Sequence, residues 1–331
     1  MTGNHSVGPP CGWEFNGIIF IIGRKIFRLQ TWSKMMNCLQ IAVVGYGHVG
    51  RCAVEAVLSA PDMELAGVVD VCPLELPGIP TGNDISQLKK VDVALLCAPS
   101  VLVPEIAPLY LTRGIHTVDS FDIHGEKLWQ HHQNADRIGK EHNTVAVISA
   151  GWDPGSDSVI RTLLMAMAPK GLTYVNFGPG MSMGHSVCAK SKKGVKDALS
   201  ITVPVGSGLH RRMVYVELEE GADIQSVEQA IKADDYFRHD ETHVTAVASL
   251  DELKDMGHCV LLERKGISGI TNNQRFEYRM TINNPALTSQ IMVSCARAAA
   301  CRLKPGAYAM PEIAPLDLLP GDRETLLKTL I

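Results

Sequence analysis

A glycine-rich segment near residue 45 most constrains the fold of this chain. The stretch LQIAVVGYGHVGRCAVEAVLSAPDMELAGVVD begins with an apolar run and passes through the pattern Gly45-x-Gly47-x-x-Gly50. A segment with helical apolar periodicity follows, and a second apolar run ends at Asp70. This order predicts a strand, a tight turn, a helix and a parallel strand, which together form one βαβ unit.

Each glycine of this unit has its own physical role. Gly45 makes the tight turn, Gly47 lets the backbone approach a pyrophosphate, and Gly50 lets the helix pack closely on the strand. The free N–H groups and the dipole at the helix N-terminus favour an anion. Because the strand, the helix and an acid 20 residues beyond Gly50 are all present, the segment predicts dinucleotide binding.

The alternation of strands and helices continues to residue 151. Apolar strands are predicted at 91–99, 115–121 and 144–151, with helices at 103–114 and 125–143 between them. Such alternation predicts an α/β fold with a doubly wound parallel sheet of the Rossmann type.

Ligands of such sheets collect beyond the carboxyl ends of the strands. The residues that end strands are therefore the informative ones, and they lie at 98–100, 119–122 and 151–153. The predicted cofactor-binding residues come from the glycine turn and these strand ends: Gly45, Tyr46, Gly47, His48, Val49, Gly50, Asp70, Cys97, Ala98, Pro99, Ser100, Asp119, Ser120 and Phe121.

The pattern changes after Trp152. Between there and Pro285 the chain is rich in β-forming segments separated by glycine turns, with one clear helical pattern at 224–234. This composition predicts a second α+β domain with a mainly antiparallel sheet, which could cover the nucleotide site. A helix at 285–303 is expected to pack back on the first domain. The predicted divisions are 1–35, 36–150, 151–284 and 285–331.

Composition excludes several classes of partner. The chain has 331 residues, 46% of them hydrophobic, and a net charge of -4 with interspersed signs, so it has no basic stripe for nucleic acid. A small-molecule partner is expected. Nine cysteines occur without a CxxC pair or an evident secretory leader, which indicates a reducing cytosol and a cytoplasmic protein.

The N-terminal apolar run GIIFIIG is too short to cross a bilayer, which needs roughly 20 apolar residues. RKIFR follows at once, and no small-residue cleavage site comes after the run. Residues 1–35 are therefore expected to be an extension outside the fold, and no membrane partner is expected.

Several longer motifs resemble one enzyme family. VVGYGHVGR, HTVDSFDIHG, SAGWDPGSDS, NFGPGMSMGHS, LHRRMVYVELE and INNPALTSQ look like meso-diaminopimelate dehydrogenase, in the branch that carries the NFGPGMSMGHS form. The likeness covers about residues 39–331. It implies a two-domain homodimer that oxidatively deaminates the D-centre of meso-2,6-diaminopimelate with NADP, in lysine and diaminopimelate metabolism.

Two carboxylates are the candidate catalytic residues. Asp122 and Asp153 each follow a strand, and by resemblance they hold the amino group that the substrate loses. Each acid could instead cap a turn, where Asp is common. Trp152 would supply an apolar wall of the site, or it could be a core residue at the domain boundary.

The resemblance also implies a set of substrate-binding residues on the second domain. Arg212 can bind a carboxylate bidentately. The neighbouring Arg211 leaves open which of the two points inward, and the resemblance to the family selects Arg212. Each of the other positions also has an ordinary structural explanation, such as a strand residue, a core imidazole, a turn or an apolar core turn. The residues are Trp152, Phe177, Met183, Gly184, Thr202, Arg212, His258 and Asn284.

Competing chemistries have weaker support. HDETH places His239 and His243 four residues apart, and a His pair stands at 131–132, but neither supplies a third metal ligand at a recognised spacing, so no metal is predicted. No cysteine has an obvious activating partner. Two other functions stay open: a dihydrodipicolinate-reductase-like enzyme and a non-catalytic dinucleotide sensor.

Asp70 departs from the family. Relatives that use NADP usually carry a basic pair at the end of the second strand, whereas this chain has Asp70 and Val71 there and no Lys or Arg before Lys89. A carboxylate accepts hydrogen bonds from the ribose 2′-hydroxyl of NAD and repels a 2′-phosphate. NAD is therefore expected to be preferred over NADP, unless Asp70 merely caps the turn and points into solvent.

Overall fold

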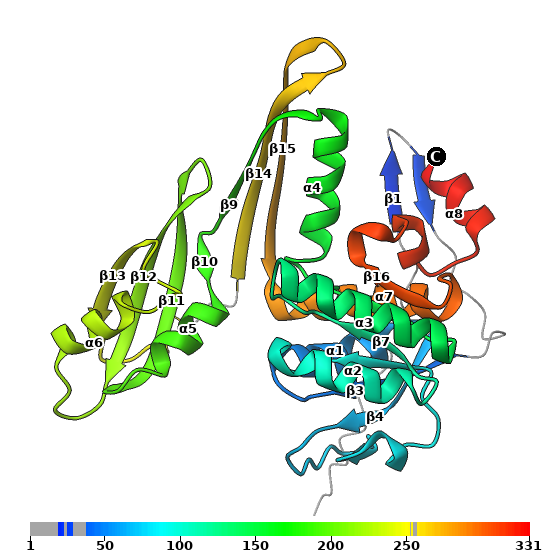
Figure 1. The fold of residues 1–331 in the computed structure, drawn as a ribbon, viewed down its shortest axis with the longest axis horizontal. Helices are drawn as coiled ribbons and strands as arrows, with labels where there is room; N and C mark the ends of the chain where they lie inside the picture. The colour runs from blue at the N-terminus through cyan, green and yellow to red at the C-terminus, as the bar shows by residue number, and fades with distance from the viewer. Residues whose placement is uncertain (1–18, 23–24, 29–37, 252, 254–256) are drawn as a thin grey trace, which may run out of the picture.

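The computed structural model describes residues 19–22, 25–28, 38–251, 253 and 257–331 (Figure 1). Its first part is a parallel sheet of seven strands in the order β16-β8-β7-β6-β3-β4-β5. This arrangement confirms the predicted doubly wound sheet. The strands are β3 (Leu39–Val44), β4 (Met63–Val69), β5 (Thr81–Gly82), β6 (Val93–Leu96), β7 (His116–Asp119), β8 (Val145–Ile148) and β16 (Gly306–Ala309).

Helices cover both faces of this sheet. Alternate residues of β3 enter separate cores: Ile41 and Val43 pack with α1 and α7, and Ala42 and Val44 pack with α2. α3 covers the β8 end of the second face. Burial on both faces explains why these strands are continuous apolar runs. The helices are α1 (His48–Ser59), α2 (Val103–Leu111), α3 (Glu126–His142) and α7 (Asn284–Cys301).

Two further sheets form the second part, and they confirm its mainly antiparallel character. One has the order β15-β14-β9 and the other β10-β11-β12-β13, in which β13 runs parallel to β12. The strands are β9 (Lys170–Phe177), β10 (Gly180–Met181), β11 (Val195–Gly206), β12 (Leu209–Leu218), β13 (Glu241–Ala246), β14 (Gly257–Ser268) and β15 (Thr271–Asn283).

The helices of this part were only partly foreseen. The pattern at 224–234 forms a helix as predicted, but NFGPGMSMGHSV, expected to be β-rich, contains a helix that begins at Met183. That helix packs on β11 and buries Ala189 completely, so tertiary contacts outweigh its weak helical pattern. The helices of this part are α4 (Ser156–Met167), α5 (Met183–Lys190) and α6 (Ile224–Lys232), whereas α8 (Arg323–Leu330) lies apart from them, on the side of β16 (Figure 1).

Residues 1–35 lie mostly outside the described residues. Two described pieces, β1 (Ile19–Ile22) and β2 (Lys25–Arg28), pair as an antiparallel ribbon. Within the described part of the chain, no helix has the length and apolar character needed to cross a membrane.

Candidate active site

The glycine turn has the geometry of an anion site. Gly45 has a φ of +94°, which favours glycine, and a Cβ at Gly50 would lie 1.9 Å from the carbonyl oxygen of Gly45. A side chain at Gly50 would therefore clash first with the glycine turn, and not with a strand as the sequence predicted. Among the described residues, a Cβ at Gly47 would meet no heavy atom within 4 Å, and no side chain caps the start of α1. The open space and the free N–H groups fit a dinucleotide pyrophosphate.

Asp70 is fastened to this turn. Its Oδ2 accepts a hydrogen bond from the Tyr46 N–H at 2.7 Å, and its Oδ1 accepts one from the Cys72 N–H at 2.9 Å. The side chain therefore caps its own turn and also holds the glycine turn. Each carboxylate oxygen keeps a further lone pair for a ligand. His48 and Val49 begin α1, and the Val49 carbonyl accepts a hydrogen bond from Ser289 on α7 at 2.7 Å.

The next strand end supports the loop that carries Asp122. Cys97, Ala98 and Pro99 follow β6, and burial raises the pKa of the Cys97 thiol to about 12, so this thiol is uncharged. The Oγ of Ser100 accepts a hydrogen bond from the backbone N–H of Asp122 at 3.2 Å. Asp122 itself is exposed and follows β7.

Asp119 and Phe121 lie behind the strand ends. Asp119 is fully buried, and its Oδ1 accepts hydrogen bonds from the N–H groups of Phe121 at 3.0 Å and Ser149 at 3.2 Å. Its Oδ2 lies 3.2 Å from Nε2 of the buried His131. Phe121 is 1% exposed. In this structure both residues support the site rather than line it, and they hold the loops after β7 and β8 together.

The loop after β8 is a compact turn. The Gly151 N–H donates to the Pro154 carbonyl at 3.1 Å, and a Cβ at Gly155 would lie 1.9 Å from the Gly151 carbonyl oxygen. A Cβ at Gly151 would also lie 3.4 Å from the Ser120 side chain, so the loops after β7 and β8 are adjacent. This packing presents Trp152 and Asp153 beside the end of the sheet.

Trp152 joins an aromatic cluster with the second part of the molecule. Its ring centroid lies 5.8 Å from that of Phe177 on β9 and 4.8 Å from that of His258 on β14. His210, which the sequence analysis did not select, accepts a hydrogen bond from the Phe177 N–H at 2.9 Å. The buried Trp152 Nε1 has no hydrogen-bond partner among the described residues.

The charge of Arg212 acts on this cluster. Burial lowers the pKa of His258 and of His210, and the positive charge of Arg212 lowers both further. Both imidazoles are therefore neutral near pH 7. The carbonyl of Cys259 accepts a hydrogen bond from Nδ1 of His258 at 3.0 Å, which fixes that ring.

The structure distinguishes the two neighbouring arginines. Arg212 pairs directly with Thr202 across β11 and β12, its Nη1 donates to the Thr202 Oγ1, and its side chain is only 13% exposed. Its Nε donates to the Asp240 Oδ2 at 2.6 Å. Arg211 is 41% exposed and pairs with Glu241. Two acids of the HDETH segment thus pair with the two arginines, Asp240 with Arg212 and Glu241 with Arg211. Asp240 is a supporting residue that the sequence analysis missed.

The remaining predicted residues lie around this cluster. The Trp152 N–H donates to the Thr288 Oγ1 at 3.3 Å, and that hydroxyl donates to the Asn284 Oδ1 at 3.0 Å, which ties the first turn of α7 to the Trp152 loop. Gly184 lies in the first turn of α5, where a Cβ would be 3.5 Å from the Tyr236 ring. The side chain of Met183 lies outside the description.

Asp153 has two charged neighbours that the sequence analysis did not select. The Arg161 Nη2 lies 2.6 Å from the Asp153 Oδ1 and 2.6 Å from the Asp157 Oδ2. Only the spacing of Asp157 and Arg161, one helical turn apart, could have indicated their pairing.

The structure brings five of the predicted substrate residues together: Trp152, Phe177, Thr202, Arg212 and His258. A sixth, Asn284, is joined to them through Thr288.

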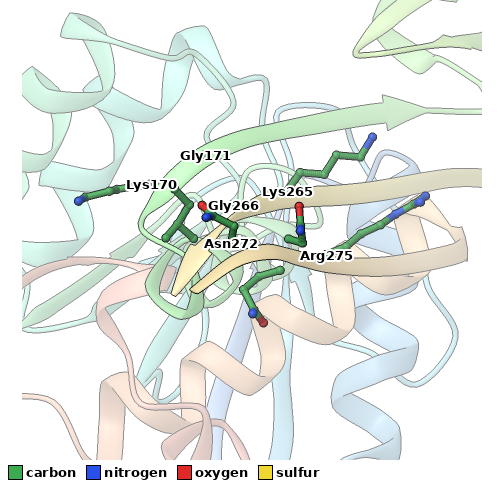
Figure 2. Close-up of a pocket in the computed structure, with 9 residues that line it drawn as sticks. Lys170, Gly171, Lys265, Gly266, Asn272 and Arg275 are labelled. Carbon is green, nitrogen blue, oxygen red and sulfur yellow. The ribbon is translucent and has the colours of Figure 1, made fainter. Parts of the chain in front are cut away.

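A cavity of about 730 Å³ opens elsewhere, at the end of the sheet formed by β9, β14 and β15 (Figure 2). It is lined in part by Lys170, Lys265, Asn272 and Arg275 and contains none of the predicted site residues. This cavity is therefore separate from the candidate active site at the carboxyl ends of the parallel strands.

Comparison with known sequences finds one enzyme family. The family model "Diaminopimelic acid dehydrogenase C-terminal domain" matches residues 151–211. A meso-diaminopimelate D-dehydrogenase of Bacteroides fragilis is 54% identical over 294 residues, covering 87% of this chain and 98% of the relative. A meso-diaminopimelate D-dehydrogenase of Acetivibrio thermocellus is 33% identical over 335 residues, covering 88% of this chain and 98% of the relative.

Solved structures share the whole architecture. A Corynebacterium glutamicum DAP dehydrogenase in complex with DAP has a TM-score of 0.82 at 28% identity, covering 89% of this chain and 100% of that chain. An engineered D-amino acid dehydrogenase bound to NADP+ has a TM-score of 0.77 at 27% identity, with coverage of 89% and 100%.

The fold and the site define a two-domain, dinucleotide-dependent dehydrogenase. The glycine turn, the parallel sheet and the separate β-rich part all belong to this class. The chain belongs to the meso-diaminopimelate D-dehydrogenase family.

Proposed function

We propose that this enzyme oxidatively deaminates the D-centre of meso-2,6-diaminopimelate to L-2-amino-6-oxopimelate and ammonia, reversibly and with NAD(P). The observation that carries the proposal is the placement of opposite charges around one aromatic cluster. Asp153 adjoins Trp152, and the charge of Arg212 reaches His258 in the same cluster. A diamino dicarboxylate that turns the amino group of one end toward Asp153 and the carboxylate of its other end toward Arg212 requires this pairing of charges.

The residues of the chain act by binding and orientation. The glycine turn and Asp70 would hold NAD(P), which when bound would supply the acceptor for the hydride of the D-α-carbon. The C=N carbon left on the substrate would then add water and release ammonia. The amine must be neutral when the hydride leaves, because an ammonium has no lone pair to form the C=N bond. Asp122 and Asp153 hold this amine, and Arg212 and Thr202 hold the distal carboxylate. Positioning of this kind supplies most of the rate acceleration.

A coupled assay tests the proposed reaction. The purified enzyme should reduce the dinucleotide with meso-diaminopimelate and release one ammonia per dinucleotide reduced. Tight dinucleotide binding without turnover would favour a sensor, and turnover only with a cyclic imine substrate would favour a reductase of the dihydrodipicolinate type.

We further propose that NAD is the preferred dinucleotide. Asp70 is held by Tyr46 and Cys72 at the end of β4, where a carboxylate meets the ribose 2′-hydroxyl. The segment from residue 71 to residue 88 contains no Lys or Arg to neutralise a 2′-phosphate. The NADP+ of the engineered relative is therefore a property of that protein, from which this chain is inferred to depart.

Substitution of Asp70 tests this preference. We expect kcat/KM for NAD to exceed that for NADP by at least about tenfold, and Asp70→Asn, which keeps the size of the side chain, to narrow the ratio. Arg137→Met is the control and should leave this ratio unchanged, because Arg137 is exposed on α3 and pairs with Glu141. A higher kcat/KM for NADP in the unmodified enzyme would refute the role of Asp70.

We also propose a homodimer in the cytoplasm. The three-stranded sheet leaves Leu172 61% exposed on β9, directly after Gly171, which lines the cavity, and this face is available to a second copy. The free cysteines of the described residues suit a reducing compartment. Light scattering of the purified enzyme gives the molecular mass, and a monomer would refute the dimer.

A further inference from the structure

The start of α4 places a shared cation behind Asp153. Asp157 and Arg161 lie one turn apart on this helix, and the Arg161 Nη2 bridges the Asp157 Oδ2 and the Asp153 Oδ1, each at 2.6 Å. The backbone N–H of Asp157 also donates to the Trp152 carbonyl at 2.9 Å. The helix is therefore fastened to the turn that presents Asp153.

Burial makes this arrangement costly. The Asp157 side chain is fully buried, and the Asp153 and Arg161 side chains are 17% and 32% exposed. Among the described residues, the Asp157 Oδ1 and the Arg161 Nε are buried without a hydrogen-bond partner. Burial, and next the charge of Asp153, raises the pKa of Asp157 to about 6. A helix selected for stability alone would satisfy or remove such groups.

We infer that Arg161 and Asp157 are positioning residues for Asp153. Arg161 holds the Oδ1 of Asp153, so that the Oδ2 is left for the substrate amine. Asp157 in turn holds Arg161 and prevents it from pairing with both oxygens of Asp153. The inference rests on the proposed function, because it takes Asp153 as the group that meets the amine.

The arrangement also keeps negative charge beside the amine. One guanidinium serves two carboxylates, so Asp153 is not fully neutralised by Arg161. Without the Asp157 charge, Arg161 can form a bidentate pair with Asp153, the geometry that it prefers with a single carboxylate. Both oxygens would then be occupied, and the amine would lose its partner. Asp157→Asn should therefore impair substrate binding although it removes a buried charge.

Steady-state kinetics of four variants test the inference. Arg161→Met, Arg161→Lys and Asp157→Asn are compared with Arg137→Met, which breaks the exposed pair of Arg137 with Glu141 on α3. We expect Arg161→Met and Asp157→Asn each to lower kcat/KM for meso-diaminopimelate by about tenfold or more, with KM for the dinucleotide within about twofold. Arg161→Lys should recover part of the loss, and Arg137→Met should match the unmodified enzyme.

Thermal unfolding separates positioning from simple structural support. Asp157→Asn should keep the Tm of the unmodified enzyme or raise it while the kinetic loss appears, and this variant decides the question if Arg161→Met does not fold. Values of kcat/KM within twofold of the unmodified enzyme, or a loss that parallels a fall in Tm, would overturn the inference. An unmodified enzyme without activity on meso-diaminopimelate would instead refute the proposed function, and the inference with it.

Discussion

Carboxylates close together in the sequence have different surroundings at this edge of the sheet. Asp119 is buried and holds Phe121, Ser149 and His131, whereas Asp122, three residues later, is exposed and free to meet a ligand. The same residue type is thus a buried hydrogen-bond acceptor at Asp119 and an exposed side chain at Asp122, where the proposed function places it against the substrate amine. The two acids differ in burial and in hydrogen bonding, and neither property can be read from the sequence.

The two exposed or half-buried acids give the first prediction at this scale. Asp122→Asn and Asp153→Asn should each lower kcat with meso-diaminopimelate by at least about a hundredfold, because the proposed function places both carboxylates against the amine and not against the dinucleotide. Their dissociation constants for the dinucleotide, measured by fluorescence titration, should stay near that of the unmodified enzyme. A loss confined to KM for the dinucleotide would show that these acids lie on the cofactor side.

Substitution of Arg212 gives the second prediction at the residue scale. Arg212→Met should weaken meso-diaminopimelate binding by roughly 2–5 kcal/mol, the cost of leaving a buried carboxylate without its charge partner. Arg211→Met is the matched control, because Arg211 pairs with Glu241 and is more exposed. Isothermal titration with the bound dinucleotide measures both. Equal losses in the two variants, or none in Arg212→Met, would show that Arg212 does not hold the substrate.

At the scale of elements, local patterns predicted the parts that are local. The unit β3–α1–β4 was predictable because its glycines, periodicity and terminal acid are contiguous in the chain. α5 was not, because its stability depends on packing against β11. Asp240 was missed for the same reason: its partner Arg212 lies 28 residues away on a neighbouring strand. Contacts between distant segments leave no trace in periodicity.

The glycine turn provides a matched pair of substitutions. Gly50→Ala should lower the Tm, because its Cβ would lie 1.9 Å from the Gly45 carbonyl oxygen. The backbone of the turn would have to shift to relieve this clash. Gly47→Ala should leave the Tm nearly unchanged, since its Cβ would meet no atom of the described part of the chain within 4 Å, but it should weaken dinucleotide binding. Differential scanning fluorimetry with and without dinucleotide measures both effects. Unchanged dinucleotide affinity in Gly47→Ala would contradict a pyrophosphate at this turn.

At the scale of the molecule, the candidate site depends on segments far apart in sequence. α7 packs with α1 in the core of the parallel sheet, and its first turn reaches the Trp152 loop through Thr288. The aromatic cluster joins that loop to β9 and β14. Most of the predicted substrate residues were found through whole motifs rather than through spacing, because no local pattern shows which segments meet.

The stereochemistry of the substrate tests the central claim most directly. The enzyme is assayed with NAD and NADP on the separate meso and LL isomers of 2,6-diaminopimelate, and dinucleotide reduction and ammonia release are followed together. The account predicts turnover with the meso isomer, which has a D-centre, and none above background with the LL isomer, which has none. Equal rates with both isomers, or no reduction with the meso isomer, would contradict it.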